Sequence, residues 1–382
     1  MSDGNFGGEV GFLSRHTDLI VLDVQKPALV AVAPAWQGRV MTSTPGGPEG
    51  PSLGWVNRRF IESGRRDTAF DNYGGEDRFW LGPEGGQFAL WFSKGQGFEL
   101  ANWRTPPGLN AGQFSVTSRG PGSVAMAARF DCTNYSGARF EVAVKRIVDV
   151  LSLDQVAAHL GCAVPPGLAM VAFQTTNTLA NVGRSPWRRD TGLLSVWTLG
   201  QFNPLPRGLV IVPFIPGPED KLGPLPNGAY FGQPPADRFR VGDGHVLFRC
   251  DGRHRGKLGV GPLRARRAMG SYDPDAGLLS LVQFNLPTGA ARLPYVNSLW
   301  EIQGQPYAGD VVNSYNDGPA GDAEPLGGFY ELETSSPAAE LDPEQAITQV
   351  HRTYHFAGDP GKLNAVAQAV LGVDLTKLEF PA

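Results

Sequence analysis

Hydrophobic and polar residues alternate along much of the chain with a period of two, the pattern of strands that bury one face. In residues 139–150, Phe140, Val142 and Val144 fall on one side, and Glu141 falls on the other. Comparable strand-like runs are 18–33 (two strands split at Lys26-Pro27), 87–92, 123–130, 170–177, 193–199, 209–215, 245–250, 278–284, 299–304, 328–334 and 349–356. The pattern therefore predicts a dozen or more strands.

Helix signals are few. Ser152 followed three positions later by Gln155 is a capping-box pattern and predicts a helix over 152–161. Asp359 stands at an N-cap position and predicts a second helix over 359–372. Two short helices among so many strands favour a large antiparallel β-sandwich.

Composition supports that fold class. The 50 glycines and 32 prolines make up about a fifth of the chain, well above average usage, and indicate many turns. With no internal repeat and no clear linker, we expect one all-β domain over residues 1–382. The proline-rich segment 213–235 is interpreted as a long loop over a binding face, with an inter-domain linker as the alternative.

Charge and hydropathy exclude several classes of partner. Thirty-three basic residues against thirty-seven acidic ones give a net charge of −4, which offers no electrostatic reason to bind nucleic acid or an anionic membrane. No apolar run approaches eighteen residues, and the N-terminus lacks the pattern of a signal peptide. The three cysteines lie far apart and form no paired motif. We therefore expect a cytoplasmic protein.

The segment from Tyr73 to Phe88, YGGEDRFWLGPEGGQF, gathers candidate binding groups between paired glycines. Its members are Asp77, Arg78, Trp80 and Glu84. An acid, an Arg fork and a flat indole together suit a polyhydroxylated ligand, which needs both donors and acceptors. The alternative is a glycine-rich turn with a surface ion pair and a core Trp.

Two carboxylates form the candidate catalytic pair. Glu331 and Glu333 are two residues apart, so on a strand both project from one face. Such a face is either solvated or lines a pocket, where a carboxyl group acts as general acid or base. Lys257 and His254 lie in a basic stretch that is either an ordinary charged loop or a contributor to the same pocket.

The run 293–319 adds Trp300 and Tyr315 as candidate contacts, with a plain hairpin turn as the alternative. The zinc motifs HExxH and HxH are absent, so we expect no resident metal and no cofactor. The sequence leaves open whether a divalent ion helps to hold the ligand, because Glu76, Asp77 and Asp317 could supply oxygen atoms to it.

Four segments resemble the galactose mutarotase-like (aldose 1-epimerase) superfamily and occur in its order. They are VAPAWQGRVMTS (32–43), GGEDRFWLGPEGGQF (74–88), TTNTLANVG (175–183) and FYELETSSPA (329–338). The resemblance implies a β-supersandwich with a sugar site on a concave face.

Carried over residue by residue, the resemblance makes Glu333 the general base and Arg78 a ligand of sugar hydroxyls, with Arg39 as a further contact. Asn177 matches the family's Asn, but Thr178 follows it where mutarotases place their catalytic His. Thr178 cannot act as the acid, so either Glu331, Lys257 or His254 supplies the proton or the protein catalyses a different reaction.

The sequence thus predicts a carbohydrate-active protein with a small-molecule saccharide as its partner. The first hypothesis is an epimerase that acts at or near the anomeric centre. The alternatives are a non-catalytic carbohydrate-binding protein, or a lyase or hydrolase that acts on oligosaccharides in the same concave site.

Overall fold

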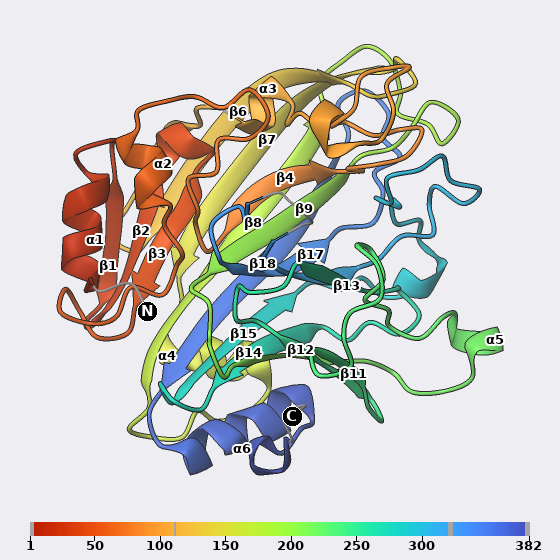
Figure 1. Ribbon diagram of the computed structural model, residues 1–382. Helices are drawn as coiled ribbons and strands as arrows, with labels where there is room; N and C mark the ends of the chain where they lie inside the picture. Colours follow the sequence, from red (N-terminus) through yellow and green to blue (C-terminus); the bar gives the residue numbers. More distant parts are fainter. Residues whose placement is uncertain (1–3, 111, 320–323, 379–382) are drawn as a thin grey trace.

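The computed structural model describes residues 4–110, 112–319 and 324–378. Its strands form three antiparallel sheets (Figure 1). The first sheet has the order β1-β2-β3, with β1 at Ile20–Gln25, β2 at Ala28–Ala33 and β3 at Arg39–Thr44. The second sheet has the order β13-β16-β17-β9-β4, with β13 at Gly256–Val260, β16 at Val312–Asn316, β17 at Tyr330–Ser335, β9 at Ser195–Phe202 and β4 at Arg78–Gly82.

The third sheet is the largest and has ten strands in the order β11-β12-β10-β14-β15-β18-β8-β7-β6-β5. Their bounds are β5 Ser115–Arg119, β6 Ser123–Thr133, β7 Arg139–Val150, β8 Ala169–Asn181, β10 Leu209–Pro213, β11 Phe239–Val241, β12 His245–Arg249, β14 Ala268–Asp273, β15 Leu278–Phe284 and β18 Ala346–Ala357. The predicted class, a large antiparallel β-sandwich with a few short helices, is confirmed.

The helices are short and lie around the sheets. The α-helices are α1 Phe6–Leu13, α2 Arg58–Glu62, α3 Pro107–Asn110, α4 Leu153–Leu160, α5 Glu219–Leu222 and α6 Pro360–Leu371. The 3-10 turns are η1 Pro34–Trp36, η2 Leu100–Asn102, η3 Ala290–Arg292 and η4 Leu375–Lys377. No helix in the described ranges is long and apolar enough to cross a membrane.

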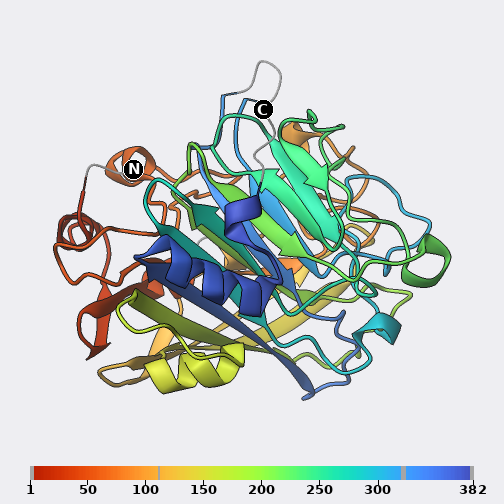
Figure 2. The ribbon, with the colours of Figure 1, turned by 90° about the horizontal axis from the view of Figure 1, so that it is seen from below.

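Both predicted helices are present with the predicted caps. In α4, the Gln155 side chain accepts the Ser152 amide at 2.8 Å and the Ser152 hydroxyl accepts the Gln155 amide, which closes the capping box. In α6, Asp359 caps the Lys362 amide at 3.0 Å. Helices α4 and α6 cover one face of the ten-stranded sheet (Figure 2).

The face of the large sheet opposite α4 and α6 packs against the five-stranded sheet. Residues of β10, β12 and β15 meet residues of β9, β16 and β17 there. On β17, Tyr330 and Leu332 point into this core and are almost fully buried. Burial of each such large side chain stabilises the fold by roughly 1.5–3 kcal/mol. The other face of β17, which carries Glu331 and Glu333, therefore points away from this core.

Two predicted strands were wrong. Residues 87–92 and 299–304 form turns and bends. In 87–92, the backbone bonds locally, with the Leu90 amide donating to the Pro83 carbonyl at 3.0 Å. Leu90 and Trp91 belong to the two alternating sets and are both buried, so the alternation did not mark a sheet face.

Candidate active site

One face of the five-stranded sheet carries most of the site. Registration across β13, β16, β17 and β9 places Lys257 beside Tyr315, Tyr315 beside Glu331, and Glu331 beside Gln201. On the edge strand β4, Trp80 pairs with Trp197 of β9. Because side chains two residues apart on a strand share a face, Arg78 and Glu333 lie on this face as well.

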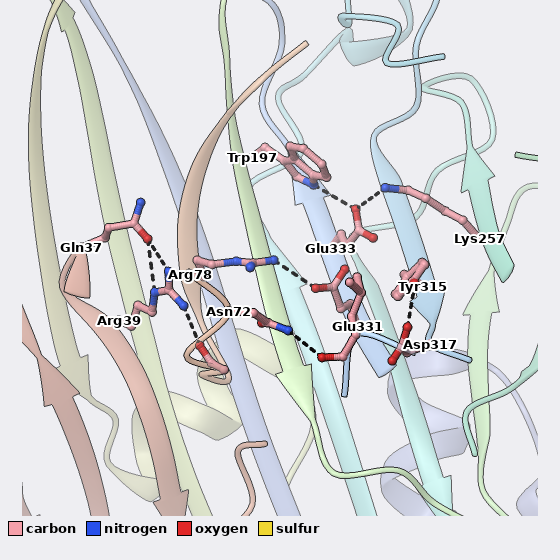
Figure 3. Close-up of polar contacts among 12 residues, drawn as sticks. Gln37, Arg39, Asn72, Arg78, Trp197, Lys257, Tyr315, Asp317, Glu331 and Glu333 are labelled. Carbon is pink, nitrogen blue, oxygen red and sulfur yellow. Dashed lines mark hydrogen bonds and ion pairs between the residues drawn. The ribbon is translucent and has the colours of Figure 1, made fainter. Parts of the chain in front are cut away.

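Glu331 and Arg78 form a buried hydrogen-bonded pair, in which Arg78 Nη2 donates to Glu331 Oε1 at 3.0 Å (Figure 3). Burial raises the pKa of Glu331 to about 8, against the opposing effect of Arg78. Burial likewise lowers the pKa of Arg78, against the effect of Glu331 and Glu333. For both partners, loss of hydration outweighs their mutual attraction. Burial thus favours the protonated form of Glu331, in which the carboxyl oxygen still accepts the bond from Arg78.

Glu333 and Lys257 form the second pair on this face. Lys257 Nζ lies 3.0 Å from Glu333 Oε2, and the Trp197 indole N–H donates to the same oxygen at 2.9 Å (Figure 3). Glu333 is fully buried. Burial lowers the pKa of Lys257, but the carboxylates around it, Glu333 foremost, more than offset that effect and raise the pKa. Lys257 is thus held as a cation.

A cavity of about 460 Å³ lies over this sheet face, within the range of small-molecule sites. Its floor includes Arg78, Lys257 and Glu331. Its walls are largely aromatic and comprise Phe60, Phe70, Trp80, Trp103, Trp197, Phe231, Trp300, Tyr315 and Phe329. Flat apolar rings around polar groups suit the two kinds of surface that a sugar presents.

Loops from three parts of the chain close the walls. Gly85 allows the 298–300 loop to lie against Glu84, since a Cβ there would be 2.3 Å from the Leu299 carbonyl oxygen. The Glu84 carboxylate accepts the Trp103 indole N–H at 2.9 Å. Burial raises the pKa of Glu84, an effect that Lys257 opposes.

Asp317 fixes another loop. Its Oδ2 accepts the amides of Gly327 and Gly328, each at 2.8 Å, and its Oδ1 accepts the Tyr315 hydroxyl at 2.9 Å. These bonds hold the turn that leads into β17 and its neighbour Phe329 at the cavity wall.

Several buried polar atoms around the cavity have no protein partner among the described residues. They are Nε and Nη1 of Arg78, Nε1 of Trp80, both side-chain polar atoms of Gln201, and Oε1 of Glu333. Native proteins satisfy most buried polar groups, so a cluster of such atoms at one cavity indicates that a polar ligand or water completes it.

The structure brings together most of the predicted site residues. Arg78, Trp80, Glu84, Lys257, Trp300, Tyr315 and Glu331 all line the cavity. Glu333 lies directly beneath, bonded to the lining residues Lys257 and Trp197. The predicted shared face of Glu331 and Glu333 is thus present, and it is enclosed by loops instead of open to solvent.

Four predicted contacts do not line the cavity, namely Arg39, Asp77, Asn177 and His254. Arg39 is fully buried and donates to the Gly74 carbonyl at 3.0 Å and to Gln37 (Figure 3). His254 contributes its backbone carbonyl to Asn316 at 2.9 Å.

Asp77 and Asn177 belong to a separate buried network centred on Arg146. Arg146 forms an ion pair with Asp77 and donates to Asn177 Oδ1 at 2.6 Å. Thr175 donates to the other oxygen of Asp77 at 2.9 Å. The segment around Asn177 is part of β8 in the ten-stranded sheet, so its likeness to the mutarotase motif does not bring Asn177 or Thr178 to the cavity.

Sequence reasoning missed the cavity residues Trp103, Trp197, Gln201, Phe231 and Arg255. Trp197 lies on a predicted strand, and its place on the site face follows only once β9 is paired with β17. Phe231 lies in the segment 213–235, which was interpreted as a loop over a binding face, and the cavity position agrees with that interpretation.

The described part of the chain contains no group of three or more His, Cys, Asp or Glu residues placed to hold a metal ion. Glu76, one of the candidate oxygen donors, instead bonds His355 at 2.9 Å.

The profile of a family of unknown function, DUF6786, matches residues 4–380. The chain belongs to this family. No curated protein matches the sequence of this DUF6786 member.

Solved structures share its fold. A candidate aldose 1-epimerase from Escherichia coli K12 superposes with a TM-score of 0.51 at 12% identity, covering 88% of this chain and 99% of that protein. A protein from Synechocystis sp. PCC 6803 gives a TM-score of 0.50 at 11% identity, covering 90% and 96%. The DUF6786 chain therefore shares the fold of these two proteins, as the resemblance to the galactose mutarotase-like superfamily predicted.

Proposed function

We propose that this protein is a carbohydrate-active enzyme that interconverts the anomers of a sugar, in the manner of an aldose 1-epimerase. The observation that carries the proposal is the cluster of unpartnered donors and acceptors, on Arg78, Gln201 and Glu333, beside an aromatic cavity. Sugar hydroxyls supply both donors and acceptors, and sugar C–H faces pack on indole rings. The fold shared with a candidate aldose 1-epimerase is consistent with this role.

Anomer exchange needs a base at the anomeric hydroxyl and an acid at the ring oxygen. Those two oxygens are bonded to one carbon, so the acid and the base have to lie close together. Glu331 and Glu333 occupy alternate positions on one strand, with Cα atoms roughly 6.6 Å apart at about 3.3 Å per residue. Two ionisable groups at one site favour an enzyme over a simple binding protein.

In the proposed reaction, Glu333 takes the proton of the anomeric hydroxyl. The bond between the anomeric carbon and the ring oxygen breaks, its electron pair stays on the ring oxygen, and Glu331 delivers a proton there. The open aldehyde rotates about its bond to carbon 2, and the reverse steps close the ring as the other anomer. Both protons return to their donors, so no co-reactant is consumed.

The two carboxyl groups are assigned by their surroundings. Lys257 and the Trp197 N–H both stabilise the ionised form of Glu333, which suits a base. The pKa of Glu331 is raised to about 8. A general acid is most effective when its pKa lies near the pH at which the enzyme operates, so this value suits Glu331 to the role of acid near neutral pH. Lys257, with its raised pKa, is a weaker acid and acts instead as the partner of Glu333.

The decisive experiment is NMR of anomeric exchange with purified protein and a panel of aldoses, uronic acids and sugar phosphates. Wild-type protein is expected to accelerate exchange of at least one sugar, and Glu333→Gln to abolish the acceleration. Binding without faster exchange would make the protein a saccharide-binding module, and full activity in Glu333→Gln would overturn the role of Glu333.

A further inference from the structure

Arg255 is the cation of the site that the proposed reaction does not use. It immediately precedes β13, is half-buried, and its guanidinium lies 4.1 Å from the centroid of the Phe231 ring. It lines the main cavity and also a smaller lobe of about 130 Å³ that shares Glu84, Lys257 and Trp300 with it.

The other two cations of the cavity each have a carboxyl partner. Arg78 lies 3.0 Å from Glu331 and Lys257 lies 3.0 Å from Glu333. Within the ranges that the structure describes, Arg255 has no carboxylate within 4 Å, and its buried Nε has no hydrogen-bond partner. Buried arginines elsewhere in the chain have acceptors for their guanidinium groups, a carboxylate in the case of Arg146 and backbone carbonyls in the case of Arg264.

The nearby carboxylate of Asp317 does not fill this gap. Both of its oxygens are committed, to the amides of Gly327 and Gly328 and to the Tyr315 hydroxyl. Glu84 accepts the Trp103 indole N–H. Partial burial of a guanidinium group without a counter-charge costs free energy. A ligand that accepts hydrogen bonds from the group offsets this cost.

The smaller lobe has the size of a charged substituent. Its volume of about 130 Å³ corresponds to roughly four water molecules, enough for a carboxylate or phosphate group and too little for a second sugar ring. Phe231 holds the guanidinium plane by stacking, and a rigid planar fork binds paired oxygens in bidentate fashion.

We propose that the ligand of this site is an anionic sugar, whose carboxylate or phosphate group binds Arg255 in the smaller lobe while the sugar ring lies over Glu331 and Glu333. This inference rests on the proposed function and adds to it the chemical class of the substrate. Arg255 acts as a specificity-determining contact, remote from the bonds that change.

The test is a binding titration followed by tryptophan fluorescence, since Trp80, Trp103, Trp197 and Trp300 all line the cavity. The ligands are glucose, glucose 6-phosphate and glucuronate, with the galactose series alongside, at low ionic strength. The proteins are wild type, Arg255→Gln, and the matched control Arg253→Gln, which alters an exposed neighbour that bonds Asp251 through its backbone amide.

We expect wild-type protein to bind one anionic sugar at least ten-fold more tightly than its neutral parent. The ratio of the affinity for the anionic sugar to that for the neutral sugar should fall at least ten-fold in Arg255→Gln and stay at the wild-type value in Arg253→Gln. Preference for the phosphate or for the uronate identifies the source of the charge.

Equal affinity for charged and neutral sugars, or an Arg255→Gln variant that binds like wild type, would overturn the inference. If the neutral sugar is still bound and its anomers exchanged, the proposed function survives that failure. If no sugar of either kind binds to any of the proteins, both proposals fail together.

Discussion

Lys257 and Glu333 lie on strands separated by one other strand, yet their charged groups meet at 3.0 Å beneath the cavity. The Trp197 N–H donates to the same carboxylate oxygen, and the other oxygen of Glu333 has no partner among the described residues. The pair thus combines a structural task, neutralising two buried charges, with the proposed chemical one.

Breaking this pair from the lysine side is expected to destabilise the protein strongly. Lys257→Met leaves Glu333 as an uncompensated buried charge, which should lower the free energy of unfolding by about 3–5 kcal/mol. Urea denaturation measures the change. The exposed Lys94→Met is the matched control and should stay within about 0.5 kcal/mol of wild type.

The double variant Lys257→Met with Glu333→Gln should recover a large part of that loss, because no charge is then left buried. If the double variant is as unstable as the sum of the two single ones, the pair is not energetically coupled and the interpretation is wrong.

Glu333→Gln by itself is expected to fold and to lose activity. An amide oxygen still accepts the bonds from Trp197 and Lys257, but the amide cannot take a proton, so the acceleration of anomer exchange should fall by at least about 100-fold. Circular dichroism and thermal melting establish that the variant is folded. Activity within a few-fold of wild type would assign the base to another residue.

The pH dependence of activity should report the proton on Glu331. Because the pKa of Glu331 is raised to about 8, the general acid is lost as the pH rises through that value, and the rate should decline above about pH 8. Glu331→Gln should be poorly active at every pH. The pH–rate profile of wild type checks this, and a rate that stays level to pH 10 would contradict it.

The stability of the fold should also depend on the protonation of Glu331, and it should decrease as the pH rises. A carboxyl group whose pKa is higher in the folded state than in the unfolded state stabilises the fold fully below the unfolded value of about 4.5. That contribution is lost as the pH rises through about 8. The melting temperature of wild type should therefore fall more steeply between pH 5 and 9 than that of Glu331→Gln.

The Arg146 network should separate structural from ligand-binding residues. Asp77→Asn leaves the fully buried Arg146 without its counter-charge and is expected to cost about 3–5 kcal/mol in stability. Affinity for the sugar should be unchanged in the folded variant, because neither Asp77 nor Arg146 lines the cavity. If the folded Asp77→Asn variant binds the sugar much more weakly than wild type, Asp77 belongs to the binding site after all.

Local sequence signals determined much of this protein. Period-two alternation placed most strands, and the caps of α4 and α6 were readable because helix termini are satisfied by side chains within three or four residues. The common face of Glu331 and Glu333 followed from strand geometry alone, and the side-chain chemistry of Arg78, Trp80 and Glu84 was enough to predict that they share one site. These features depend on neighbours along the chain.

What only the tertiary structure decided is which strands pair and which loops fold over them. Asp77 and Arg78 are adjacent in sequence, but successive strand residues point to opposite faces, so Asp77 entered the network of Arg146 and Arg78 entered the cavity. Trp197, Gln201 and Arg255 carry no motif, and they join the site because β9 and β13 flank the pair of strands β16 and β17. Long-range pairing is set by the burial of the whole sheet, and no short window of sequence contains that information.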